Sequence, residues 1–392
     1  MNVYDYIRLS VRRGLVALVR RRIYLIMMII APIVSAWFLL DLMKVGTAGH
    51  APVGIVDLDR SSMSRALTRR LSTFEQVNVT GFYHDFTEAR EAVQRGEILG
   101  FFYIPADLSE KALGGQKPTL SYYINYAYYA PASMQFKGFK TITVLANGAI
   151  VSNVMTELGL EGFNGLSISS TLQPIVVDAH MPGNPWLNYS YYLNPSFIPT
   201  LFALIIFLVT AFSIGIELKY KTCRDWVLNA GGSMGVAVTG KLMPQTVIFF
   251  IVGWTIQWLM YRVYHLPLNC PPWHMIIAMP LFVLANQAFA LTVMSLVPNF
   301  RYGTTICSLF GVLAFSLGGY SLPGEAMYSW VTPIGYILPA KYYFLLSVDQ
   351  ALNGLDLYYS KWYYAALVAF TILPWAITWR LKRECLNPVY VP

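Results

Sequence analysis

Long uninterrupted apolar runs dominate the pattern of hydrophobic and polar positions along this chain. A helix rises 1.5 Å per residue, so about 20 apolar residues cross a hydrocarbon core of about 30 Å. Six segments reach or approach that length, at 23–43, 197–215, 243–263, 275–297, 302–320 and 362–380. The pattern predicts an α-helical membrane protein with six transmembrane helices.

The region between the first and second apolar runs has a different pattern, in which short apolar and polar stretches alternate. We expect strands at 52–56, 76–80, 98–104 and 171–178, and helices at 61–71, 86–95, just after Pro105, and from 132 to about 160. Strands that alternate with helices indicate a small α/β domain. We assign it to residues 44–196, inserted between the first and second transmembrane helices.

Three acidic residues in this domain, Asp57, Asp59 and Asp107, raise the question of a metal or acid/base site. Each stands at a turn or a helix N-terminus, where backbone N–H groups need an acceptor. We therefore interpret them as capping residues.

A dense group of tyrosines follows in the same domain, at Tyr122, Tyr123, Tyr126, Tyr128 and Tyr129. Alternation along a strand would bury some of these rings and expose others. Core packing and a docking surface for a substrate or partner both remain open.

The placement of charge gives the orientation of the spans. Only 12% of the residues are charged, and the net charge of +8 is concentrated in short runs beside the apolar segments. Lys and Arg gather before the first run, after the second, at the turn before the fifth and in the C-terminal tail, as in Arg8–Arg22, Lys219–Lys241, Arg301 and Arg380–Arg383. Since cytoplasmic loops carry the excess of Lys and Arg, both termini are expected in the cytoplasm and the α/β domain outside it.

Residues 1–22 mix arginines with apolar residues at helical spacing, including Tyr6, Leu9, Val16 and Val19. This pattern indicates a basic amphipathic helix on the inner membrane surface. The alternative is that the arginines only set the topology.

Several other activities are disfavoured by the composition. The four cysteines are scattered singly and show no zinc spacing, and clustered nucleophiles or carboxylates are absent from the apolar runs. The positive charge is confined to short runs, and stretches such as Phe197–Gly215 carry no ionisable group, which does not suit a nucleic-acid binder. The segment Gly235–Leu242 approaches a phosphate-binding loop, but Leu242 stands where a hydroxyl is required.

Within the spans, the polar candidates are few: Thr210, Gln257, Asn286 and Gln287. They either line a substrate path or join helices by hydrogen bonds, and we favour the second role. Residues 321–361 form an outer segment rich in Gly and Pro at its start, which predicts an irregular structure sheltered by protein.

Three segments of the chain resemble permeases of the ABC-2 type, in the multidrug and small-molecule exporter branch of ATP-binding cassette transporters. They are Val53–Leu67 with Arg95–Leu108 in the outer domain, Glu217–Asn229 with Gly240–Pro244, and Leu322–Glu325 with Leu338–Tyr343. The family usually has a Gly-Thr pair in the second segment, where this chain has Lys221 before Thr222. The usual proline near 230–233 is also missing.

This resemblance implies that the loop 216–241 holds a coupling helix for a separate ATPase. The expected interface residues are Glu217, Lys219, Lys221, Thr222, Arg224 and Asp225, with Trp226 as a buried anchor. The alternative is an ordinary positively charged loop at the lipid headgroups.

The implied function is that of a non-catalytic permease subunit of an exporter in the bacterial inner membrane, for a small amphipathic, drug-like or lipid-like substrate. We expect no cofactor on this chain, because ATP and Mg²⁺ would bind the partner ATPase. The expected partners are ABC ATPase subunits, a second permease copy or paralogue, membrane lipids and a periplasmic membrane-fusion adaptor. The competing hypothesis is a non-transporting receptor or secretion-apparatus scaffold that binds through its outer domain.

Overall fold

In a computed structural model, the chain folds into two compact units, one of residues 1–46 and 181–392 and one of residues 47–180. The structure describes residues 3–44, 51–73, 77–113, 119–125, 188–320 and 327–387, and a few residues between 132 and 140. Each unit has its own hydrophobic core.

The first unit is helical, and its described part contains six helices long and apolar enough to cross a membrane. They are Arg22–Leu42 (α2 Arg22–Leu25, η1 Ile26–Ile30, α3 Ala31–Leu42), α9 (Tyr189–Lys219), Met234–Val263 (α11 Met234–Trp258, η2 Leu259–Val263), α12 (Pro272–Leu296), α13 (Phe300–Leu317) and Leu357–Leu386 (α16 Leu357–Ile372, η5 Leu373–Ala376, α17 Thr378–Leu386). The prediction of a helical protein with six apolar helices of membrane-spanning length is confirmed for the described residues.

The second span begins earlier than its apolar run at 197–215 predicts. The side chain of Asn188 accepts a hydrogen bond from the Ser190 N–H group, so α9 starts at Tyr189 and continues through Pro195 and Pro199. The cap fixes this start, whereas hydropathy marks only the apolar part of the helix.

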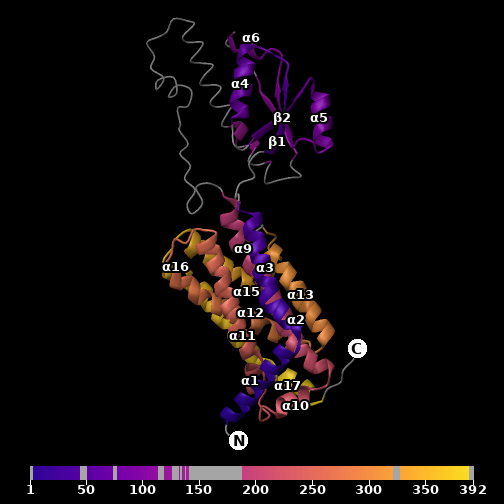
Figure 1. The fold of residues 1–392 in the computed structure, drawn as a ribbon, viewed down its shortest axis with the longest axis vertical. Helices are drawn as coiled ribbons and strands as arrows, with labels where there is room; N and C mark the ends of the chain where they lie inside the picture. Colours follow the sequence, from indigo (N-terminus) through magenta and orange to yellow (C-terminus); the bar gives the residue numbers. More distant parts are fainter. Residues whose placement is uncertain are drawn as a thin grey trace. The chain divides into compact units, whose positions relative to one another are not determined.

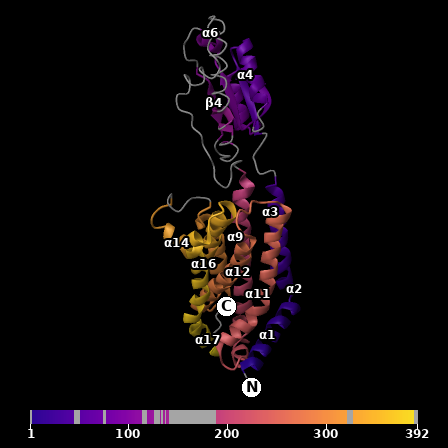
Figure 2. The same cartoon turned by 90° about the vertical axis from the view of Figure 1, so that its left-hand side faces the viewer.

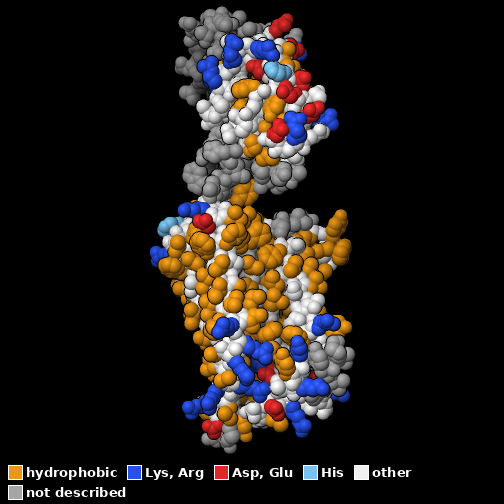
Figure 3. Space-filling model, turned by 45° about the vertical axis from the view of Figure 1, so that its right-hand side comes forward, with side chains coloured by type: hydrophobic (Ala, Val, Ile, Leu, Met, Phe, Trp, Pro, Cys, Tyr) orange, Lys and Arg blue, Asp and Glu red, His pale blue; other side chains and the backbone are white. Residues whose placement is uncertain are grey.

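The helices differ in how much of their surface the unit covers. Most of α9 and α12 is buried, whereas α3, α13 and α16 leave many apolar side chains exposed. Figure 3 shows hydrophobic side chains covering the flank of this unit, with most of its visible Lys and Arg near one end. An apolar flank with basic residues at one end suits a bilayer.

Three short or amphipathic helices lie together at that basic end: α1 (Val3–Arg20), α10 (Cys223–Leu228) and α17 (Figures 1 and 2). The basic helix predicted for residues 1–22 is thus present as α1. An even number of span-length helices brings α1 and α17, the first and last helices of the described residues, to the same end of this unit.

The segment between α13 and α16 is irregular, as its glycines and prolines predict. It contains α14 (Thr332–Tyr336), α15 (Pro339–Leu346) and η4 (Ser347–Leu352), and α15 packs on α9, α12 and α16. Neighbouring helices therefore shelter this part of the chain. The segment 321–326, with Glu325, lies outside the described residues.

The second unit is a four-stranded sheet in the order β2-β1-β3-β4, flanked by helices. Its elements are β1 (Ala51–Asp57), α4 (Ser62–Ser72), β2 (Val77–Tyr83), α5 (Phe86–Gln94), β3 (Gly100–Ile104), α6 (Leu108–Leu113) and β4 (Ser121–Ile124). Strand β1 pairs in parallel with β2 and β3, and β4 closes one edge antiparallel to β3. Helices α4 and α6 pack on one face and α5 on the other, which confirms the α/β prediction for this stretch (Figure 1).

Asp57 and Asp59 cap a turn and a helix end in this unit, as predicted, whereas Asp107 is held by an ion pair. The Asp57 carboxylate accepts from the N–H groups of Asp59 and Arg60 and from the Ser64 hydroxyl. Asp59 accepts from the N–H and hydroxyl groups of Ser109. Asp107 pairs with Lys111 at 2.5 Å, and this hydrogen bond lowers the pKa of the carboxyl.

The tyrosines of β4 pack on both faces of the sheet. Tyr122 stacks on Phe102 at 4.8 Å and Tyr123 stacks on Phe101 at 4.9 Å. Both rings therefore pack against the sheet, although Tyr123 also remains 42% exposed. Tyr126, Tyr128 and Tyr129, most of the predicted helix at 132–160 and the predicted strand at 171–178 lie outside the described residues.

Candidate functional site

The hairpin between α9 and α11 is the candidate site at the basic end of the helical unit. Helix α9 ends at Lys219, and Lys221 turns the chain with a φ of 57° before α10 begins at Cys223. Gly231 and Gly232, with φ of 68° and 76°, turn it again before α11. Two left-handed turns thus hold a short helix across the ends of two spans.

Helix α10 has one buried face, formed by Cys223, Trp226 and Val227. Trp226 is only 1% exposed, and its ring N–H group donates a hydrogen bond to the Ala237 carbonyl at 3.1 Å. The expected anchor residue therefore fixes α10 to the body of its own chain. In this position the ring is unavailable to a partner.

The opposite face of α10 is exposed. Arg224 and Asp225 are exposed, and so are Lys219 and Lys221 beside the helix. Leu228 and Tyr220 are 55% and 59% exposed and lie among these charges. Sequence reasoning missed both apolar residues, although the helical period from Trp226 already places Leu228 on the other face.

Glu217 lies inside the unit, in a cluster of charges. Its carboxylate accepts from Lys241 at 2.5 Å and from Arg13 at 2.8 Å, and the Thr222 hydroxyl also donates to it. The Lys241 side chain is 3% exposed. The cluster joins α1, α9 and α11, so the structure places Glu217 and Thr222 in internal contacts.

Sequence reasoning did not pair these charges, because Arg13 and Lys241 lie 204 and 24 residues from Glu217 in the chain. The only signal was that Glu217 follows the apolar run 197–215 by two residues, still within helix α9. Runs of Lys and Arg indicate the orientation of the spans, but they do not identify the residue with which each charge forms an ion pair.

Helices α1 and α11 cross closely at small residues. A Cβ atom on Gly240 would lie 2.4 Å from the Ser10 Cβ atom, and one on Gly14 would lie 3.0 Å from the Lys241 carbonyl oxygen. The Ser10 hydroxyl donates to the Ala237 carbonyl at 3.2 Å, the same oxygen that accepts from Trp226. Helices α1, α10 and α11 therefore meet at one carbonyl group.

The near-match to a phosphate-binding loop lies in this crossing. Residues 235–242 belong to helix α11, and Gly240 is packed against Ser10. A phosphate loop needs free backbone N–H groups between a strand and a helix. The helical hydrogen bonds of this stretch do not provide them.

Two of the four polar span residues join helices. Gln257 donates to the Met275 carbonyl and the Tyr343 hydroxyl at 2.8 and 3.0 Å, and Gln287 accepts from Thr246 at 2.7 Å. Asn286 donates to the Phe282 carbonyl within its own helix, and Thr210 is fully buried. These contacts show interhelical packing for Gln257 and Gln287.

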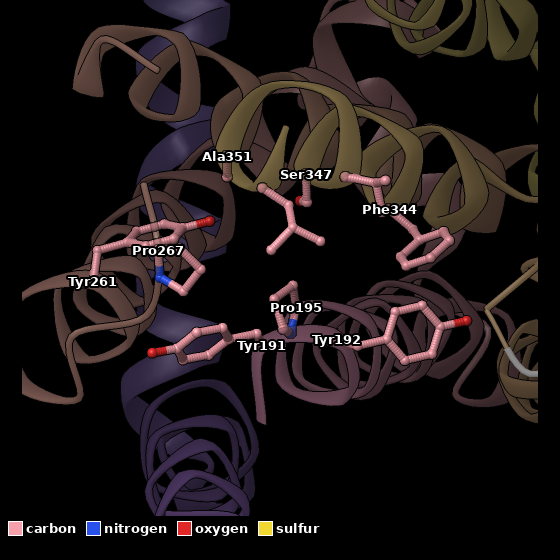
Figure 4. Close-up of a pocket in the computed structure, with 10 residues that line it drawn as sticks. Tyr191, Tyr192, Pro195, Tyr261, Pro267, Phe344, Ser347 and Ala351 are labelled. Carbon is pink, nitrogen blue, oxygen red and sulfur yellow. The ribbon is translucent and has the colours of Figure 1, made fainter. Parts of the chain in front are cut away.

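A small cavity lies between α9 and the α15–η4 segment (Figure 4). Tyr191, Tyr192 and Pro195 face Phe344 and Ser347 across it. Its volume of about 10 Å³ holds about one water molecule. The polar span residues do not line it, and a substrate would need the helices to separate.

The comparison with known families agrees with this architecture. The model of a family described as ABC-2 family transporter protein matches residues 22–380. No curated protein matches the chain. The match covers five spans, most of the sixth and the inserted α/β unit, so this chain is a multi-pass membrane protein of the ABC-2 transporter family.

Proposed function

We propose that this chain is the permease subunit of an ATP-binding cassette exporter, and that a separate ATPase docks on the α9–α11 hairpin. Permeases of the ABC-2 family work with ABC ATPases, which supports the partnership. The proposed cargo is a small amphipathic, drug-like or lipid-like molecule, and the proposed location is the bacterial inner membrane with both termini in the cytoplasm.

The observation that carries this proposal is the two-faced character of α10. One face is locked into the helical unit by Trp226, while the other presents Arg224, Asp225 and Leu228. An apolar residue with charged neighbours is a common centre for a protein interface. The coupling helix of the proposal is therefore α10.

The contacts behind α10 are suited to pass movement to the spans. The Ala237 carbonyl ties α10 and α1 to α11, and Glu217 ties α9 to α11 and α1. Displacement of α10 by an ATPase would move these helix ends together. Packed helices and ion pairs transmit such shifts because they have few alternative arrangements.

The remaining partners follow from exposed surfaces. Helices α3, α13 and α16 keep broad apolar faces, which lipid or a second permease copy would cover. The α/β unit would guide cargo or dock a periplasmic adaptor. ATP and Mg²⁺ belong to the ATPase in this scheme.

The test is co-purification with an ABC ATPase encoded beside this chain. Replacing both exposed residues, Arg224→Glu with Leu228→Asp, should lower ATPase recovery about tenfold, because one apolar contact is lost and one charge is reversed. The matched control is Arg301→Glu, which reverses an exposed charge at the same end of the unit. Equal recovery with both variants would contradict the proposal and favour a receptor or scaffold.

A further inference from the structure

A second cavity lies on the flank of the helical unit, between the first span, α9 and α13. It is a groove of about 220 Å³. Its lining is apolar apart from two hydroxyl groups, and consists of Ile23, Tyr24, Met27, Ile205, Leu208, Val209, Phe212, Phe300 and Thr304. Ile23 and Met27 are nearly half exposed, so the groove opens to the outside of the unit.

The basic end of this groove carries two cations. The Lys219 ammonium group lies 5.4 Å from the ring centre of Phe300, which lines the groove. The Arg21 guanidinium group lies 5.6 Å from the ring centre of Tyr220. In the described part of the chain neither cation has a carboxylate partner, so both positive charges are uncompensated.

The distance from the cations to the far lining residues matches one acyl chain. Lys219 and Ile205 are on the same helix, 14 residues apart. At 1.5 Å per residue this separation is about 21 Å, on the order of the length of one bilayer leaflet. When the apolar lining of the groove lies at the depth of the acyl chains in the bilayer, Lys219 and Arg21 therefore lie at the depth of the lipid headgroups.

We propose that this groove binds an anionic phospholipid from the leaflet at the basic end of the unit, with one acyl chain along α9 and the phosphate near Lys219 and Arg21. Charge complementarity selects this occupant over a zwitterionic lipid or a cationic amphiphile. The inference concerns lipid bound to this chain alone and does not depend on the ATPase.

The first test is native mass spectrometry of the purified full chain, offered equal amounts of phosphatidylglycerol and phosphatidylcholine with the same acyl chains. The wild type should retain phosphatidylglycerol preferentially. Lys219→Gln and Arg21→Gln should each lower that preference roughly fivefold, as one surface cation does for an anionic lipid. The control is Lys221→Gln, which removes an exposed charge without an aromatic contact to the groove.

The second test fills the groove. Leu208→Trp, at a half-buried lining residue, should reduce retention of both lipids, while Ile251→Trp on the exposed face of α11 should not. The proposal is overturned if the wild type retains both lipids equally, or if Lys219→Gln and Lys221→Gln have the same effect. A lipid-free dimer whose second copy covers the groove would also overturn it.

Discussion

At the scale of single residues, Lys221 holds a backbone conformation that glycine adopts more readily. Its φ of 57° lies in the left-handed region, which costs a residue with a Cβ atom roughly 1 kcal/mol. Related permeases usually have glycine here, and the structure supplies the reason: the chain must turn sharply from α9 into α10. Lysine in place of glycine therefore keeps the turn but lowers the stability of the protein.

Substitutions at Lys221 should change stability in a defined order. Lys221→Gly should raise the free energy of unfolding slightly, by less than about 1 kcal/mol, because glycine removes strain but gains freedom when unfolded. Lys221→Val should lower it by about 1 kcal/mol, since β-branched residues avoid this region. Thermal unfolding in detergent measures both. The same pair at Lys219, the last residue of helix α9, provides the control, because no left-handed strain is relieved there and glycine should not stabilise the protein.

The Glu217 cluster gives a second prediction at this scale. Glu217→Ala should destabilise the helical unit by about 3 kcal/mol, because Lys241 would remain buried without a partner. Glu217→Ala with Lys241→Met should recover most of this loss, since the second change removes the stranded charge. Thermal unfolding of the two variants distinguishes the effects. If the double variant is no more stable than the single one, the ion pair does not explain the loss.

At the scale of elements, the crossing of α1 and α11 depends on small residues. Gly240→Val should push the helices apart, because even its Cβ atom would meet Ser10 at 2.4 Å. We expect a loss of 1–3 kcal/mol, about the usual cost of overpacking, and faster amide hydrogen exchange in α1. Thr239→Val, at the exposed neighbouring position, should leave exchange in α1 unchanged. Unchanged exchange in both variants would show that α1 is held by other contacts.

Helices and strands were predictable from the sequence where a single pattern, such as apolar length or alternation, determines where they form. The length of the apolar runs predicted the six spans. Alternation of apolar and polar residues, together with capping residues, predicted β1, α4 and β2 with ends within about three residues of those observed. The start of α9 was missed because a cap, and not hydropathy, sets it. What Trp226 anchors was not predictable either, because a loop tryptophan suits a partner surface and an internal anchor equally until its neighbours in space are known.

The candidate site was less predictable than the fold, for a physical reason. Its contacts join residues far apart in the chain, such as Arg13 with Glu217 and Cys223 with the Cys385 carbonyl. Sequence identifies each polar group but not its partner. The exposed face of α10 is an exception, because a single helical period separates Leu228 from Trp226.

At the scale of the whole molecule, this ABC-2 family chain has an α/β unit inserted after the first of its six candidate spans. An ABC permease needs its coupling helix in the cytoplasm, where the ATPase and ATP are, and this arrangement would leave the inserted unit on the other side of the membrane. The basic flanks of the spans support that orientation. Helix α10 and the α/β unit are therefore expected on opposite sides of the membrane.

Cysteine labelling tests this claim most directly, because all four native cysteines are buried and should react little. New cysteines are placed at two exposed positions, Asp225→Cys on α10 and Arg90→Cys in the α/β unit. In cells with a permeabilised outer membrane, a membrane-impermeant maleimide should label Arg90→Cys and spare Asp225→Cys, and inside-out vesicles should reverse this result. Labelling of both positions from the same side would contradict the account.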